Sequence, residues 1–293
     1  MTPPPKPPRE HDLGLEYDLG TLRRRRFLGL FAGAGLAAVA GCAPDSANDS
    51  ATDSATDSAT SGTTTTSSTP SATSSPTSST TTGTTDVDEI PQETAGPYPG
   101  DGSNGPNVLT ESGIVRKDIT KSFGSASGVA TGVPLTVELT ILDADKDTPL
   151  AGAAVYLWHC DAEGRYSLYS DGATNENYLR GVQAADANGK VTFTSIFPAA
   201  YMGRWPHIHF EVYSSLSEAT AAGKISATSQ LAFPKNVCDT VYATDGYDGS
   251  AQNMQQTSLE DDNVFGDDDG VHQLATVTGD VSSGYVAKLN VGV

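Results

Sequence analysis

Alternating apolar and polar positions recur along the C-terminal two-thirds of the chain and predict a series of short β-strands. Successive side chains of a strand point to opposite faces, so this alternation marks strands with one buried face. Turns rich in Gly, Asn and Asp separate the segments, which is typical of a sandwich or barrel. The predicted strands span residues 134–143, 153–160, 189–198, 207–213, 225–234, 272–281 and 284–293. The pattern therefore predicts an all-β fold, an antiparallel β-sandwich core with long loops.

The remaining parts of this region lack strand periodicity. One short helix is predicted near residues 217–222, and residues 237–269 are predicted to form long loops. Functional residues often lie on such loops. Acidic clusters at 245–248 and 260–270 lack a complete EF-hand pattern, so we interpret them as solvated loops rather than calcium sites.

The amino-acid composition divides the chain into three predicted regions. Residues 1–42 form a leader, and residues 43–87 consist almost entirely of Ser, Thr, Ala, Asp, Gly and Pro. Such a segment cannot bury enough apolar surface to fold, so a disordered tether is predicted there. Residues 88–293 are then expected to form one β-sandwich domain.

The leader contains the stretch RRRRFLGLFAGAGLAAVAGC at 23–42. Adjacent arginines before a modest apolar run resemble a twin-arginine export signal, and VAGC resembles a bacterial lipobox. The apolar run at 27–40 is too short for an ordinary transmembrane helix, although a weak membrane anchor is the alternative interpretation. These resemblances predict lipidation of Cys42 and a protein held by a lipid anchor at the extracytoplasmic face of the cell membrane.

The charge restricts the classes of binding partner that the sequence predicts, and the cysteines bear on a possible disulfide. With 36 Asp and Glu against 17 Lys and Arg, the net charge is −19, which argues against binding to nucleic acid. After Cys42, only Cys160 and Cys238 remain. In an oxidising compartment these two are predicted to form a disulfide, with two separate buried thiols as the alternative.

The candidate chemistry begins with His207 and His209, which are two residues apart in a predicted strand and therefore share one face. Two imidazoles suit zinc, copper, nickel or iron, but zinc sites usually add a thiolate, a carboxylate or a third histidine. Tyr166 and Tyr201 lie in connections near this strand. Phenolate oxygen is a hard anionic donor that favours ferric iron, and a strong Lewis acid is needed to ionise tyrosine at neutral pH.

Three segments resemble the intradiol ring-cleavage dioxygenases, the catechol and protocatechuate dioxygenase family. They are GRYSLY after VYLWH, SIFPAAYMGRWPHIHF, and IPQETAGPYPG, and the resemblance extends over about residues 90–234. It implies a non-haem Fe(III) cofactor and cleavage of a catechol by O2 between the hydroxyl-bearing carbons, giving a muconate-type diacid. The residues it assigns as metal ligands are Tyr166, Tyr201, His207 and His209, and those it assigns to catalysis are Arg204, Tyr201 and Gln230.

Several alternatives stay open at this stage. Tyr169 competes with Tyr166 as the first tyrosine ligand, and the two histidines alone also suit a zinc or copper site. A catalytically inactive β-sandwich lipoprotein that binds carbohydrate or protein is the main alternative function. Pro97, Tyr98 and residues 172–177 are the candidates for substrate specificity, and because none of them is a cation, neutral catechols are favoured over carboxylated ones.

Overall fold

The computed structural model describes residues 87–293. The predicted leader, the lipidation of Cys42 and the predicted tether concern residues outside this range. Within it, no helix is long and apolar enough to cross a membrane.

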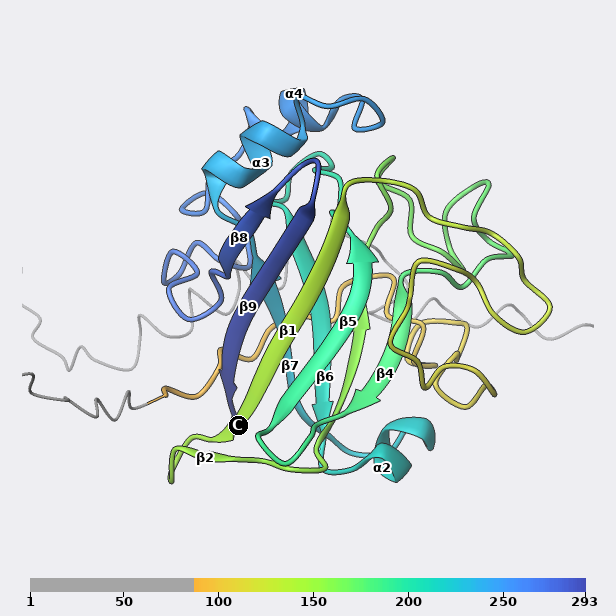
Figure 1. The fold of residues 1–293 in the computed structure, drawn as a ribbon, viewed down its shortest axis with the longest axis vertical. Coiled ribbons are helices and arrows are strands. Elements are labelled where there is room, and N and C mark those ends of the chain that lie inside the picture. The colour runs from red at the N-terminus through yellow and green to blue at the C-terminus, as the bar shows by residue number, and fades with distance from the viewer. Residues whose placement is uncertain (1–86) are drawn as a thin grey trace, which may run out of the picture. The chain divides into compact units, whose positions relative to one another are not determined.

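The described residues form two β-sheets that stack on each other (Figure 1). In the first sheet the strand order is β2-β1-β9-β8, and β5 also pairs with β1, along the edge that faces away from β9 and that β2 extends. In the second sheet the order is β4-β3-β6-β7. Strands β1 and β9 pair in parallel, whereas the other strand pairs are antiparallel. The strands are β1 (Pro134–Asp143), β2 (Thr148–Pro149), β3 (Ala154–Trp158), β4 (Arg180–Ala184), β5 (Lys190–Ile196), β6 (His207–Tyr213), β7 (Ile225–Ala232), β8 (Thr276–Asp280) and β9 (Gly284–Gly292). The predicted all-β sandwich is confirmed.

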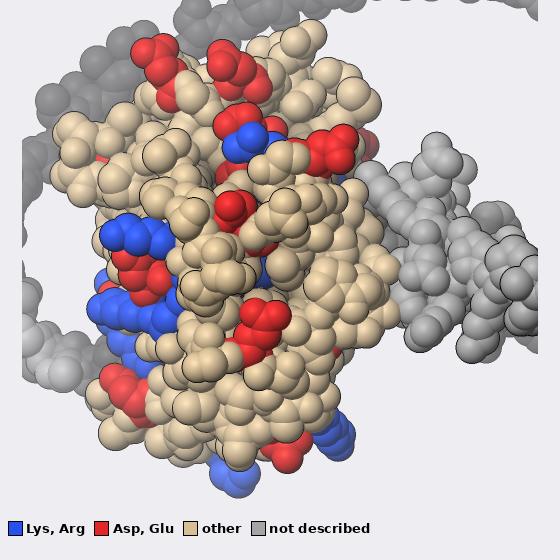
Figure 2. Space-filling view, turned by 90° about the vertical axis from the view of Figure 1, so that its right-hand side faces the viewer, with Lys and Arg blue, Asp and Glu red and all other residues tan. Residues whose placement is uncertain are grey.

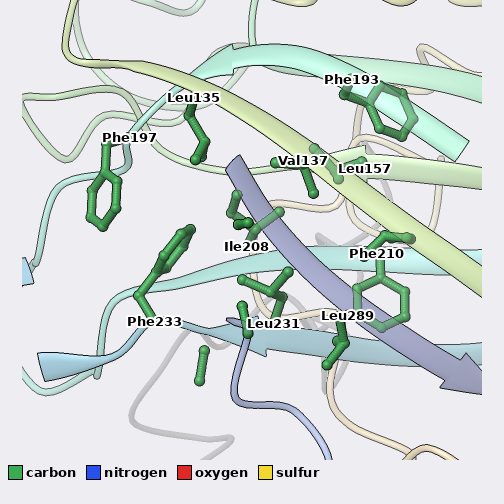
Figure 3. Close-up of a cluster of buried hydrophobic side chains, with 14 of the residues drawn as sticks. Leu135, Val137, Leu157, Phe193, Phe197, Ile208, Phe210, Leu231, Phe233 and Leu289 are labelled. Carbon is green, nitrogen blue, oxygen red and sulfur yellow. The ribbon is translucent and has the colours of Figure 1, made fainter. Parts of the chain in front are cut away.

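A continuous apolar core fills the space between the sheets (Figure 3). Strands β1, β3, β5, β6, β7 and β9 contribute alternate residues to it, as the sequence pattern predicted. In β6, Ile208 and Phe210 point into this core, and in β3, Val155 and Leu157 do the same. The intervening residues of both strands therefore face away from the first sheet.

That outward face of the second sheet carries a second core. Tyr156 and Trp158 of β3 pack there against side chains from the loops that precede β1, including Val108, Leu109 and Ile114. Tyr166 belongs to the same cluster. Because His207 and His209 alternate with the core residues of β6, both histidines lie on this loop-covered face.

Short helices lie at the two ends of the sandwich (Figure 1). The helix α2 (Leu216–Thr220) confirms the predicted helix near 217–222. Two further helices, α3 (Lys235–Val241) and α4 (Ser250–Met254), occupy part of the stretch predicted to be long loops. Both are so short that they leave little helical periodicity to detect.

The predicted disulfide between Cys160 and Cys238 is wrong, because both cysteines are free and buried. Cys160 packs in the loop-covered core, where its Sγ lies 3.6 Å from the carbonyl oxygen of Ala199, whereas Cys238 lies on α3 in the core between the sheets. Burial raises the pKa of Cys160 to about 12. The alternative of two separate buried thiols is therefore the correct one.

The surface shows no large basic area on the face drawn in Figure 2. Asp and Glu side chains lie there as separate spots, while Lys and Arg gather mainly along one edge. This distribution agrees with the net charge of −19.

Candidate metal centre

The strands on both sides of β6 and the segment around Gly96 hold the imidazole of His209 in place. His209 is paired with Trp158 of β3 and with Gln230 of β7. The Trp158 ring stacks on the His209 ring with a centroid distance of 5.0 Å and an interplanar angle of 6°. On another side lies Gly96, whose φ is +70° and where a Cβ would come within 3.3 Å of His209 Cε1. The imidazole of His209 therefore has little freedom to rotate.

Hydrogen bonding sets the tautomer of His207. Its Nδ1–H donates to the carbonyl oxygen of Trp205 at 2.5 Å, which leaves Nε2 as the atom with a free lone pair. This Nε2 lies 3.0 Å from Tyr201 Oη and 3.2 Å from His209 Nε2. Tyr166 Oη lies 3.3 Å from Tyr201 Oη. Two phenol oxygens and two imidazole nitrogens thus converge on one point.

Both tyrosines come from connections that are themselves anchored. Tyr166 follows β3, and its backbone N–H donates to Ser170 Oγ at 2.9 Å. Tyr201 lies between β5 and β6, next to Ala200, whose carbonyl accepts a hydrogen bond from Asn253 Nδ2 of α4 at 2.9 Å. The hydroxyl groups are therefore positioned by local backbone contacts and do not depend on a regular strand.

Burial keeps all four groups neutral. It lowers the pKa of His207 and His209 well below 6.5, so both imidazoles are free bases at neutral pH. It raises the pKa of Tyr166 well above 10 and that of Tyr201 to about 12. A cation among these atoms would oppose the effect on the tyrosines, because positive charge stabilises the phenolate form.

The donor set fits a metal ion. Ligand atoms that are each about 2 Å from a metal lie about 2.8–3.5 Å from one another, which is the range of the distances measured here. No group of three or more His, Cys, Asp or Glu with a metal-binding arrangement occurs in residues 87–293. A metal at His207 and His209 would therefore be completed by the oxygens of Tyr166 and Tyr201, and two hard phenolates favour a trivalent cation such as Fe(III).

A buried arginine lies beside these donors. Arg204 Nη1 is 3.4 Å from His207 Nε2, Arg204 Nε donates to Asp262 Oδ2 at 2.9 Å, and Arg204 Nη2 donates to Gln230 Oε1 at 2.7 Å. Gln230 Nε2 in turn donates to the carbonyl oxygen of Thr94 at 2.9 Å. Burial opposes the charge on Arg204, but Asp262 together with Tyr201 and Tyr166 outweighs it, so the pKa of Arg204 is raised. The guanidinium is a fixed, permanently positive group next to the donor cluster.

A small cavity opens beside the cluster. Its volume is about 90 Å³. Because about 10–15 Å³ of such space holds one water molecule, the cavity suits a group the size of a single aromatic ring. Tyr166, Tyr201 and His209 line one part of it, and Pro97 and Tyr98 line another. Arg204 is the single Lys or Arg side chain in the lining.

The structure shows which of Tyr166 and Tyr169 belongs to the donor cluster. The hydroxyl of Tyr169 accepts from the backbone N–H of Gly100 and donates to the carbonyl oxygen of Asn104, each at 2.9 Å, so it belongs to the wall and not to the donor cluster. Tyr166 is the tyrosine that reaches Tyr201. The specificity candidates Pro97 and Tyr98 line the cavity, whereas residues 172–177 do not.

Sequence reasoning missed two contributors from the acidic loop at 260–270. Asp262 is fully buried against Arg204, and Asn263 lines the cavity. The interpretation of this loop as solvated is therefore wrong for these two residues. The periodicity gave no signal for them, because a single buried Asp among exposed ones has the same local pattern as a surface loop.

Comparison with known proteins shows which family this domain resembles. A family model described as Dioxygenase matches residues 104–244. A solved structure, the intradiol ring-cleavage dioxygenase from Tetranychus urticae, is 25% identical, with a TM-score of 0.54 over 70% of this chain and 94% of that chain. The domain is therefore similar to the intradiol ring-cleavage dioxygenases. The dioxygenase domain of a carbohydrate-binding fusion protein from Streptomyces sp. SirexAA-E shares 20% identity over 70% of this chain and 98% of that chain, with a TM-score of 0.42. Catechol 1,2-dioxygenase from Pseudomonas arvilla C-1 shares 19% sequence identity over 69% of this chain and 61% of that chain, with a TM-score of 0.43.

The family match contains all four donors together with Arg204 and Gln230, and it ends before Asp262 and Asn263. It also begins after the segment at 90–100, which contributes Gly96, Pro97 and Tyr98 to the cavity. The donor cluster therefore lies in the matched part, while much of the cavity wall is built from residues on either side of it.

Proposed function

We propose that this domain is a non-haem Fe(III) dioxygenase that cleaves catechol-type aromatics between the two hydroxyl-bearing carbons. One catechol and one O2 give one muconate-type diacid, so both oxygen atoms enter the product and no external reductant is required. The observation that supports the proposal most directly is the gathering of Tyr166, Tyr201, His207 and His209 beside a cavity of single-ring size. Their donor atoms lie 3.3 Å apart for Tyr166 and Tyr201, 3.0 Å for Tyr201 and His207, and 3.2 Å for His207 and His209.

Tyr166, Tyr201, His207 and His209 would hold the iron. When bound, Fe(III) supplies the Lewis acidity that keeps a catechol ionised and activates it toward O2. The neutral imidazoles provide lone pairs without a proton to lose, because burial keeps them unprotonated. The phenols of both tyrosines must ionise, which makes loading of the metal dependent on the loss of two protons.

The protein groups around the cavity have separate tasks. Tyr201 lines the cavity, so its oxygen is placed to take up a proton from an incoming catechol hydroxyl. Arg204 holds a positive charge beside the same position and stabilises negative charge that develops on the substrate. Pro97 and Tyr98 close part of the cavity and limit the access of water, which strengthens both effects.

The test is oxygen uptake by the full chain after expression with ample iron. We expect uptake with catechol, a visible absorption band from tyrosinate-to-iron charge transfer, and close to one iron per chain. A His207→Ala variant is expected to lose at least 99% of the activity and the band, because the remaining donors cannot hold the metal in place.

The alternatives give different results in the same experiment. A carbohydrate- or protein-binding module would take up no oxygen with any catechol, and its ligand binding would survive replacement of Tyr166 and Tyr201 by Phe. A zinc or copper site would appear in metal analysis of protein loaded in the cell. Either result would overturn the proposal.

We also propose that the protein is exported and lipid-anchored through Cys42. The support is the run of arginines at 23–26, the apolar stretch after it and the lipobox-like VAGC at 39–42. Expression in a bacterial host should place the protein in the membrane fraction, and a Cys42→Ser variant should move it to the soluble fraction. An unchanged distribution of the variant would contradict the anchor.

A further inference from the structure

The amide of Asn263 is a cavity-lining polar group that the donor cluster does not use. Asn263 lines the cavity together with Tyr201 and Arg204, so its side chain belongs to the same enclosed space. Its Oδ1 is buried and has no hydrogen-bond partner. A buried acceptor without a partner is costly, so a donor from a water or a ligand beside Asn263 would stabilise it.

The backbone around Asn263 is held rigidly. The preceding residue, Asp262, accepts hydrogen bonds from Arg204 Nε and the Trp205 N–H through Oδ2, and from the Val264 N–H through Oδ1. The Phe265 N–H also donates to Asp262 Oδ1, at 3.2 Å. The chain is therefore fixed on both sides of Asn263, and its side chain is presented to the cavity at little cost in conformational entropy.

The charges near the cavity restrict what this amide can recognise. Arg204 is already paired with Asp262 and Gln230, and no other Lys or Arg lines the cavity. A ring carboxylate would therefore find no free cation in the cavity, whereas a hydrogen-bond donor would find an acceptor in Asn263 Oδ1.

We propose that Asn263 determines substrate specificity by accepting a hydrogen bond from a donor substituent on the catechol ring. The substrate class is a catechol with a neutral hydroxyl-bearing substituent, and ring carboxylates are excluded. The inference rests on the proposed function and deepens it, because it assigns the recognition of the substituent to a residue outside the family match at 104–244.

The test compares two catechols of nearly equal shape in the full iron-loaded chain. The probes are 4-(hydroxymethyl)catechol and 4-ethylcatechol, with the 3-substituted pair as a second set and 3,4-dihydroxybenzoate as the carboxylated probe. The wild type is expected to favour the hydroxymethyl compound by about five- to tenfold in kcat/KM, the factor for one hydrogen bond. Dissociation constants measured without oxygen should show the same ratio, which provides a readout independent of turnover.

Variants of Asn263 test whether its side chain acts as the hydrogen-bond acceptor for the substrate. Asn263→Ala is expected to bring the ratio close to one. Asn263→Asp keeps an acceptor oxygen and should retain the preference for the hydroxymethyl compound while weakening binding of the carboxylate further. Asp261→Ala, an exposed neighbour in the same loop, is the matched control and should keep the wild-type ratio.

The outcomes distinguish this inference from the proposed function. If the wild type turns over catechol but Asn263→Ala keeps the wild-type ratio, Asn263 has no role in specificity and the dioxygenase proposal stands. If Asn263→Asp loses the preference as Asn263→Ala does, acceptance by Oδ1 is wrong. If the wild type takes up no oxygen with catechol and also binds the two probes equally, both proposals fail.

Discussion

Replacing Asp262 with alanine is expected to destabilise the domain by about 3–5 kcal/mol, because it leaves a buried guanidinium without its carboxylate. The side chain of Asp262 is fully buried, and that of Arg204 is 4% exposed. Asp262 also accepts hydrogen bonds from the backbone N–H groups of Trp205, Val264 and Phe265. The loop at 260–270 would therefore lose its main attachment to the segment that leads into β6.

The same substitution should reduce catalysis even where the domain still folds. Arg204 would lose the partner that holds its Nε and would move relative to the cavity, and such a displacement costs about a hundredfold in rate. Denaturant unfolding and oxygen uptake with catechol measure the two effects. Asp262→Asn keeps the shape but removes the charge, and we expect it to lie between the wild type and Asp262→Ala.

Asp261→Ala is the control for this experiment, because Asp261 is exposed and adjacent in sequence. Its free energy of unfolding should change by no more than about 0.5 kcal/mol. Equal unfolding midpoints for the two alanine variants would show that the buried ion pair does not hold the loop. Normal oxygen uptake by Asp262→Ala would show that Arg204 does not need this partner.

The sequence predicted the parts of the site that depend on local periodicity. The alternation in β6 assigns His207 and His209 to one face and Ile208 and Phe210 to the other, and the structure agrees. The order of two tyrosines before the histidine pair then led to the resemblance with intradiol dioxygenases. The structure brings these four side chains together, while their role as iron ligands stays a prediction.

Other parts could not be predicted because they depend on contacts between distant segments. Asp262 and Arg204 are 58 residues apart, and the acidic residues around Asp262 are typical of a solvated loop. The prediction about Cys160 and Cys238 failed for a related reason. Compartment and residue count favour a disulfide, but the two side chains pack in different cores. Strand β4 was also missed, since its five residues include the buried Arg180 in place of an apolar residue.

This arginine has an unusual role in the loop-covered core. All five N–H groups of Arg180 are used: Nε donates to Ser167 Oγ, Nη1 to the Pro99 carbonyl and Tyr156 Oη, and Nη2 to the carbonyls of Tyr98 and Ser167. Ser167 follows Tyr166 of the donor cluster, and Tyr98 lines the cavity. Arg180 therefore joins the loop that carries a proposed ligand to the segment that covers the substrate position.

We expect Arg180→Met to lower the free energy of unfolding by about 2–5 kcal/mol, because the carbonyls of Tyr98 and Ser167 would lose a buried hydrogen-bond donor. As a positioning residue, Arg180 should also affect the site itself. The variant should raise KM for catechol more than it lowers kcat, since Tyr98 would no longer be held at the cavity. The tyrosinate-to-iron absorption band should shift, since Tyr166 would change its surroundings.

Two further variants distinguish positioning from general stability. Arg116→Met removes another arginine that donates to backbone carbonyls, those of Asn177 and Arg180, but Arg116 does not line the cavity. It should lower stability without shifting the band or raising KM. Arg180→Lys keeps the charge but has a single nitrogen, which cannot reach both segments at once, so it should restore little of the wild-type KM. If Arg180→Met loses stability while its band and KM match those of Arg116→Met, Arg180 stabilises the loop-covered core and does not position the site.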